Sequence, residues 1–136
     1  ITIENYEKRI PIARENFIRA EKEEQITLLE GDAKDVLETL TEPFDLIFMD
    51  AAKGQYLNFL PRVLELLQPE GILISDNVLQ DGDIIESRFA VTRRNRTIHK
   101  RMREYLYTLT HSEELTTAVL PVGDGITIST KKGRKA

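Results

Sequence analysis

The sequence predicts an α/β protein built on a doubly wound sheet, and three observations lead to that prediction. Short apolar segments alternate four times with segments whose apolar residues recur at helical spacing. The run at 44–50, FDLIFMD, is almost continuously apolar, which is typical of a parallel strand with both faces covered. Several of the expected strands end on acidic residues, at the sheet edge where such proteins bind ligands.

In the first third of the chain, a strand at 1–4 is expected to lead into a helix at about 7–21. Pro11 should lie in the first turn of this helix, because proline disrupts a helix interior. A second strand should end near Glu30, and Asp32 is then expected to cap a short helix. The apolar stripe of that helix would consist of Ala33, Val36, Leu37 and Leu40.

The strand at 44–50 should be followed by a helix at about 55–67. The sequence PEG is expected to end this helix, and ILISDN at 72–77 is predicted to be the next strand. The buried side of the helix would carry Leu57, Leu60, Leu64 and Leu67.

The last third should hold a short helix at about 84–89, a longer helix and two closing strands. The strands at 116–122 and 125–130 would be joined by a turn at GDG, and 131–136 reads as a frayed basic tail. The longer helix is predicted to bury Ile98, Met102, Tyr105 or Leu106, and Leu109, with His99 and His111 on its surface.

The composition fits one globular domain over residues 1–136, with 40% hydrophobic residues and a net charge of −4. The absence of cysteine excludes disulfides, zinc–thiolate sites and thiol nucleophiles. No apolar run reaches the roughly 18 residues of a membrane span, and no signal peptide is evident. We therefore expect a cytoplasmic protein without a membrane partner. Since the chain opens on Ile1 inside an expected strand, we also expect it to be part of a longer chain.

Asp50, Asp76 and Asn77 form the strongest candidate site in the sequence, because they follow two apolar strands. Taken singly, an acid after a strand often only caps the next helix. Together, two carboxylates and one amide oxygen make a set of hard ligands suited to Mg²⁺, with Mn²⁺ or Ca²⁺ as alternatives. Glu4 ends an earlier strand, where an acid can accept hydrogen bonds from the ribose of an adenosine cofactor.

Five segments carry a resemblance to a known family: ITIE, GDA, FDLIFMDAAKGQY, ILISDNV and LPVGDGIT. In this order and at these intervals they resemble the cation-dependent class I O-methyltransferases, which include the catechol and caffeoyl-CoA enzymes. The resemblance covers essentially the whole chain. It implies a Rossmann-like methyltransferase fold, S-adenosylmethionine as cofactor and a bound Mg²⁺.

The resemblance also implies roles for individual residues. Its metal ligands correspond to Asp50, Asp76 and Asn77, and Lys53 matches the catalytic lysine beside the acceptor hydroxyl. The cofactor-binding positions correspond to Glu4, Asp32, Ala33 and Asp50. The first strand, glycine-rich turn and following helix of the family have no counterpart here and would precede Ile1. The chain alone is therefore expected to be inactive, and the function expected is that of the longer enzyme.

The segment at 93–103, RRNRTIHKRMR, holds six Lys or Arg residues and no acid. It is similar to the bacterial branch that methylates 5-hydroxyuridine in the tRNA anticodon loop to 5-methoxyuridine, so tRNA is the expected partner. Cations combined with Tyr107 suit phosphates and unstacked bases. The alternative is an ordinary solvated helix face. The candidate RNA-binding residues are Arg93, Arg94, Arg96, Lys100 and Arg103.

Other functions fit the sequence less well. An O-methyltransferase acting on catechol-like or caffeoyl-CoA-like molecules shares every motif named above. A signalling receiver domain also has an acid after a central strand, but its acidic pair and later lysine are not visible. A nicotinamide dehydrogenase would explain Glu4 but not Asp50 or Asp76. Members of the family commonly form dimers, so a homodimer is expected.

Overall fold

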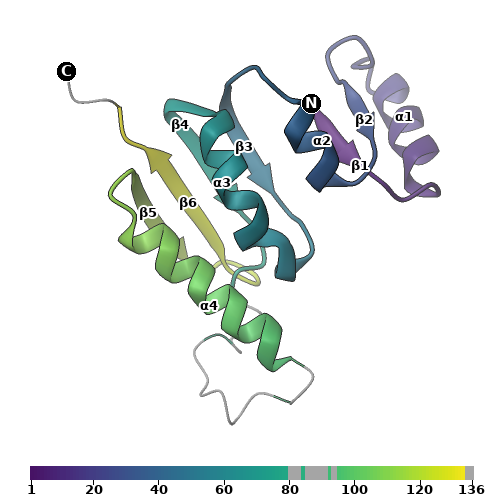
Figure 1. Ribbon diagram of the computed structural model, residues 1–136. Coiled ribbons are helices and arrows are strands. Elements are labelled where there is room, and N and C mark those ends of the chain that lie inside the picture. Colours follow the sequence, from purple (N-terminus) through teal and green to yellow (C-terminus); the bar gives the residue numbers. More distant parts are fainter. Residues whose placement is uncertain (80–83, 85–91, 93–94, 134–136) are drawn as a thin grey trace. The chain divides into compact units, whose positions relative to one another are not determined.

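The computed structural model describes residues 1–79, 84, 92 and 95–133 (Figure 1). The predicted short helix at 84–89 therefore lies almost entirely outside the described residues. The chain divides into two compact units, Ile1–Thr41 and Glu42–Ala136, and each is described by itself.

The first unit is a small α/β arrangement whose order of elements confirms the prediction. Strands β1 and β2 pair in parallel, with Ile3 opposite Leu29. Pro11 is the third residue of the first helix, so it lies in the first turn as expected. The elements are β1 (Thr2–Glu4), α1 (Arg9–Arg19), β2 (Leu28–Glu30) and α2 (Ala33–Thr39).

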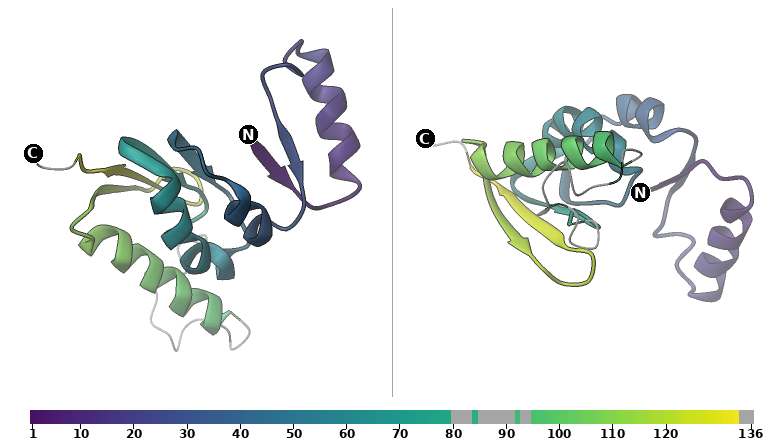
Figure 2. Two further views of the ribbon diagram at one scale, coloured as in Figure 1. Left: turned by 45° about the horizontal axis from the view of Figure 1, so that its top comes forward. Right: turned by 90° about the horizontal axis from the view of Figure 1, so that it is seen from below.

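The second unit is a mixed four-stranded sheet in the order β3-β4-β6-β5. Strands β3 and β4 are parallel, whereas β4 with β6 and β6 with β5 are antiparallel. Helices α3 and α4 lie on the same face of this sheet (Figures 1 and 2). The elements are β3 (Phe44–Met49), η1 (Lys53–Gln55), α3 (Tyr56–Leu66), β4 (Leu67–Ser75), α4 (Arg96–His111), β5 (Leu115–Leu120) and β6 (Ile126–Lys131).

The core of the second unit lies between the sheet and its two helices. Burial of a large apolar side chain contributes about 1.5–3 kcal/mol, so this cluster carries much of the unit's stability. Ser75, Thr127 and Ser129 bring buried hydroxyl groups into the same layer. The largest fully buried apolar and aromatic side chains are Tyr56, Leu67, Leu73, Val78, Met102, Tyr105 and Leu109.

The prediction that both faces of the strand at 44–50 are covered is wrong. Leu46 and Phe48 on β3 are 53% and 58% exposed. Alternate residues of a strand point to opposite faces, and the helices of this unit cover only one face.

The PEG sequence does not simply end a helix, because it lies inside β4. Helix α3 already stops at Leu66, and the strand pairing accommodates PEG as an irregularity. The register moves from Phe44 opposite Leu67 to Leu46 opposite Ile72.

The predicted buried faces of two helices are partly wrong in register. In α3 the buried residues are Tyr56, Phe59, Leu60, Val63 and Leu66, so only Leu60 is correct as a helical core residue. In α4, Met102, Tyr105 and Leu109 are buried as predicted. Ile98 is 37% exposed, and the buried position beside it is His99, at 3% exposure.

The chain closes with the predicted hairpin of β5 and β6. Its turn contains Gly123 and Gly125, both with positive φ. Lys131 is not part of a frayed tail, because it belongs to β6 and its Nζ donates to the carbonyl oxygens of Leu64 and Leu67. Among the described residues, no helix is both long and apolar enough to cross a membrane.

Candidate functional site

The parallel pairing of β3 and β4 brings two acidic residues to one edge of the sheet. Met49 and Ser75, the last residues of the two strands, are register partners. Asp50 and Asp76 follow them directly, and the Asp76 N–H donates to the Met49 carbonyl oxygen at 3.0 Å. The two carboxylates therefore leave neighbouring strand ends at adjacent positions, as predicted.

Asn77 adopts a left-handed conformation with φ of 54°. This conformation is uncommon outside glycine, although asparagine tolerates it better than most residues. The Asn77 N–H donates to Oδ1 of Asp76 at 2.8 Å, which holds that carboxylate against the backbone. The following residues are fixed by the β5–β6 turn, since the Val78 N–H donates to the Gly125 carbonyl at 3.0 Å.

Tyr56 lies directly beneath this edge, and its role was missed at the sequence level. Its side chain is 1% exposed, and its hydroxyl donates to the carbonyl oxygen of Asp76 at 2.7 Å. Burial raises the pKa of Tyr56 to about 12, and the negative charges of Asp50 and Asp76 raise it further. Both carboxylates are thus close enough to act on one phenol group. The available signal was the tyrosine that ends DAAKGQY.

Lys53 opens the η1 turn three residues after Asp50 and is half-buried. Within the described residues it forms no ion pair, which leaves its ammonium group available to a ligand. The turn is held in place by Arg101 of α4, whose Nη1 donates to the Gly54 carbonyl at 2.8 Å.

The donor set at the strand ends suits a hard divalent cation. Asp76 uses one carboxylate oxygen for Asn77, and Asp50 has no hydrogen-bond partner among the residues that the structure describes. No three His, Cys, Asp or Glu side chains converge in the described parts of the chain. A cation would therefore rely on two carboxylates and the Asn77 amide, with water or substrate completing its shell.

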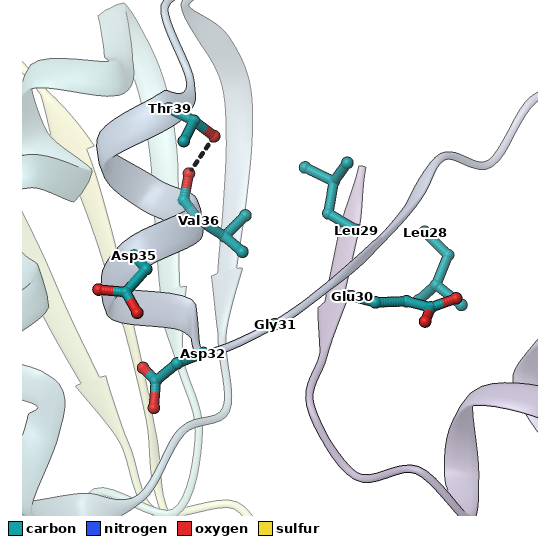
Figure 3. Close-up of a pocket in the computed structure, with 8 residues that line it drawn as sticks. All are labelled: Leu28, Leu29, Glu30, Gly31, Asp32, Asp35, Val36 and Thr39. Atoms are coloured by element: carbon teal, nitrogen blue, oxygen red, sulfur yellow. Dashed lines mark hydrogen bonds between the residues drawn. The ribbon is translucent and has the colours of Figure 1, made fainter.

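The first unit contains a pocket of about 420 Å³ after β2, at the beginning of α2 (Figure 3). Leu29 and Val36 provide its apolar side, which could accept a flat ring. Asp32 lines the pocket and caps α2 by accepting from the Lys34 N–H at 2.9 Å, as predicted. Ala33 begins α2 but does not line the pocket. The complete lining is Leu28, Leu29, Glu30, Gly31, Asp32, Asp35, Val36 and Thr39.

The carboxylate of Glu4 is already occupied by local contacts. Its Oε1 accepts from the backbone N–H groups of Asn5 and Tyr6, at 3.0 and 2.9 Å. Its Oε2 lies 3.1 Å from Nε of Arg9. A ribose hydroxyl at this position would have to share the carboxylate with Arg9, so the cofactor role of Glu4 stays a prediction.

The cations of α4 do not form one uniform surface. Lys100 is exposed, whereas Nη1 of Arg103 donates to the Ile84 carbonyl at 2.9 Å. Tyr107 is 63% exposed, and its ring stacks on His111 with centroids 3.8 Å apart. Arg93 and Arg94 lie outside the described residues.

Comparison with known structures identifies the class of fold. An O-methyltransferase from Bacillus cereus in complex with S-adenosylhomocysteine (SAH) superposes with a TM-score of 0.83 at 27% identity, over 96% of this chain and 61% of that one. An SAH-bound methyltransferase from Podospora anserina gives 0.83 at 30% identity, over 97% and 60%. The fold is thus the α/β fold of methyltransferases, which confirms the predicted fold class.

The chain belongs to the O-methyltransferase family, whose sequence profile matches residues 1–132. A caffeoyl-CoA O-methyltransferase from Eucalyptus globulus is 34% identical over 134 residues, which cover 94% of this chain and 53% of that protein. A catechol O-methyltransferase from Niastella koreensis is 36% identical over 90 residues, or 63% of this chain and 41% of that protein. The chain spans about half the length of these relatives.

Proposed function

We propose that the protein is an S-adenosylmethionine-dependent O-methyltransferase whose acceptor site is organised around one divalent cation. The observation that carries this proposal is the pairing of β3 with β4, which sets Asp50 and Asp76 side by side at the carboxyl edge of the sheet. Membership of the O-methyltransferase family supports the reaction class.

Each residue of the edge has a defined task in this proposal. Asp50, Asp76 and the Asn77 amide would hold Mg²⁺. When bound, the cation supplies positive charge that lowers the pKa of a neighbouring hydroxyl. Lys53 would accept the hydroxyl proton as a neutral amine or, as an ammonium group, stabilise the oxyanion. S-adenosylmethionine supplies the electrophilic methyl group, and the pocket before α2 would contribute to its adenosine site.

The test is methyl transfer by the complete protein to an acidic ring hydroxyl, before and after chelation. Asp50→Ala and Asp76→Ala should each reduce turnover by more than the roughly 10–100-fold that loss of an outer-shell metal partner costs. Asp45→Ala is the matched control, since Asp45 lies in the same strand and contacts Gln68 instead. Full turnover in excess chelator would refute the cation site.

The acceptor is proposed to carry an acidic hydroxyl on a ring, which both 5-hydroxyuridine and a catechol provide. We favour 5-hydroxyuridine in a tRNA anticodon loop. The specific observation in its favour is an exposed aromatic stack, Tyr107 on His111, on the same helix as exposed Lys100 and Arg101. A catechol-like or caffeoyl-CoA-like acceptor is the alternative, and a homodimer is the proposed assembly.

The two acceptors can be separated by binding and by product analysis. Combined Arg96→Ala and Lys100→Ala substitution should weaken tRNA binding and reduce the salt dependence of the affinity by nearly one unit of slope per lost phosphate contact. Methylation of a small catechol should not change. If the substituted protein bound tRNA like the wild type and methylated only small phenols, the tRNA acceptor would be excluded.

A further inference from the structure

The peptide unit between Asp76 and Asn77 is held at both of its ends. Its carbonyl oxygen accepts from the Tyr56 hydroxyl at 2.7 Å. Its N–H donates to Oδ1 of Asp76 at 2.8 Å. The orientation of this one peptide plane therefore fixes two of the proposed cation ligands at once, because the Asp76 carboxylate is bonded to it and Asn77 begins at it.

Tyr56 is in turn fixed by a second buried tyrosine. The Tyr105 ring of α4 packs edge-on against the Tyr56 ring, with centroids 5.2 Å apart and planes at 80°. The Tyr105 hydroxyl lies 2.6 Å from Oγ of Ser75. Two hydroxyl groups, one from α3 and one from α4, thus hold consecutive residues at the end of β4.

These contacts are shielded from water, which makes the loss of one of them costly. Tyr56, Tyr105 and Ser75 are each no more than 1% exposed. A carbonyl that loses its only buried donor costs about 1–3 kcal/mol unless the backbone moves to find another. Here movement is favoured, because Asn77 occupies a left-handed conformation that it would leave if the peptide plane were released.

We propose that Tyr56, supported by Tyr105, is a positioning residue that orients the Asp76–Asn77 peptide unit so that both side chains can bind a divalent cation. This inference rests on the proposed cation site and adds to it a role for two residues outside the ligand set. Removal of the Tyr56 hydroxyl should weaken cation binding without removing a ligand.

The experiment is a Mn²⁺ titration of the complete protein followed by electron paramagnetic resonance. Tyr56→Phe keeps the aromatic packing and deletes only the hydroxyl, so its Kd for Mn²⁺ should rise about 10–100-fold. Turnover should recover when Mn²⁺ is raised to saturation, because all three ligands are retained. A purely structural defect would not be rescued in this way.

Ser129→Ala is the matched control. It removes a buried hydroxyl of the same sheet, which pairs with Thr117 Oγ1 at 2.8 Å in the middle of β5 and β6. Its unfolding free energy should fall as in Tyr56→Phe, while its Mn²⁺ affinity should stay that of the wild type. If Tyr56→Phe does not fold, Tyr105→Phe serves in its place, with a smaller loss of affinity expected.

The outcomes separate this inference from the proposed function. If the tyrosine variant binds Mn²⁺ as tightly as the wild type while Asp50→Ala does not bind it, the positioning role is wrong and the cation site stands. If Asp50→Ala binds Mn²⁺ like the wild type, or the wild type binds none, the cation site itself is wrong.

Discussion

At the scale of single residues, Asp32 illustrates how one side chain can have a structural and a binding task. Its Oδ1 caps α2 through the Lys34 N–H, and the same residue lines the pocket of the first unit. The resemblance to known O-methyltransferases assigns this position to the cofactor. Capping and cofactor binding use the same carboxylate, so they must be separated by substitutions that differ in charge but not in capping ability.

Asp32→Ala should destabilise the protein by about 1 kcal/mol, because the first turn of α2 loses its cap. Asp32→Asn should retain most of that stability, since asparagine caps as well as aspartate. Chemical denaturation gives the stabilities, and calorimetric titration with S-adenosylmethionine gives the affinities. If Asp32→Ala unfolded at the same denaturant concentration as the wild type, the capping role would be wrong.

At the scale of elements, the strand ends depend on a contact between two loops. The segment after Asn77 is tied to the β5–β6 turn by the Val78 and Leu79 N–H groups, which donate to the Gly125 and Asp124 carbonyls. Gly125 has φ of +80°, and a Cβ at this position would lie 2.2 Å from Cγ of Leu79. The turn therefore has to be glycine at this point for conformation and for space.

Gly125→Ala is expected to be more destabilising than Gly123→Ala. Both glycines have positive φ, which costs an alanine roughly 1–2 kcal/mol. Only Gly125 would add a steric conflict, worth about 1–3 kcal/mol more, because a Cβ on Gly123 meets nothing within 4 Å. Urea denaturation of both variants measures the difference. Equal stabilities would mean that the turn does not pack against Leu79.

Sequence patterns predicted the order of the elements well, because alternating apolar segments and strand-end acids depend on local chemistry. They also predicted that Asp50 and Asp76 meet, since parallel strands that pair end at one edge. The pattern could not choose the buried faces of α3 and α4 correctly. Leu57, Leu64 and Ile98 are as apolar as the residues that are buried, and only packing against the sheet decides between neighbours.

Tyr56 and His99 were misjudged for a related reason. A tyrosine at a helix start and a histidine among cations both look like surface residues in a sequence. Their burial follows from tertiary contacts, such as the packing of Tyr56 on Tyr105 of a helix far along the chain. The polar groups that organise the candidate site are therefore the part of it that local patterns predict least.

At the scale of the whole molecule, the chain folds into two compact units and spans about half the length of its curated relatives. The pocket that suits an adenosine group belongs to the first unit, and the acidic strand ends belong to the second. Methyl transfer would require ligands bound by both units at the same time. For this reason activity is a property to be measured on the complete protein.

The central claim is that Asp50, Asp76 and Asn77 hold one divalent cation. The most direct test is a crystal structure of the complete protein grown with Mn²⁺, with an anomalous difference map calculated at the manganese absorption edge. The claim predicts one strong peak at the carboxyl ends of β3 and β4, bonded to oxygen atoms of all three side chains. A map with no peak there, or side chains too far apart to share an ion, would contradict it.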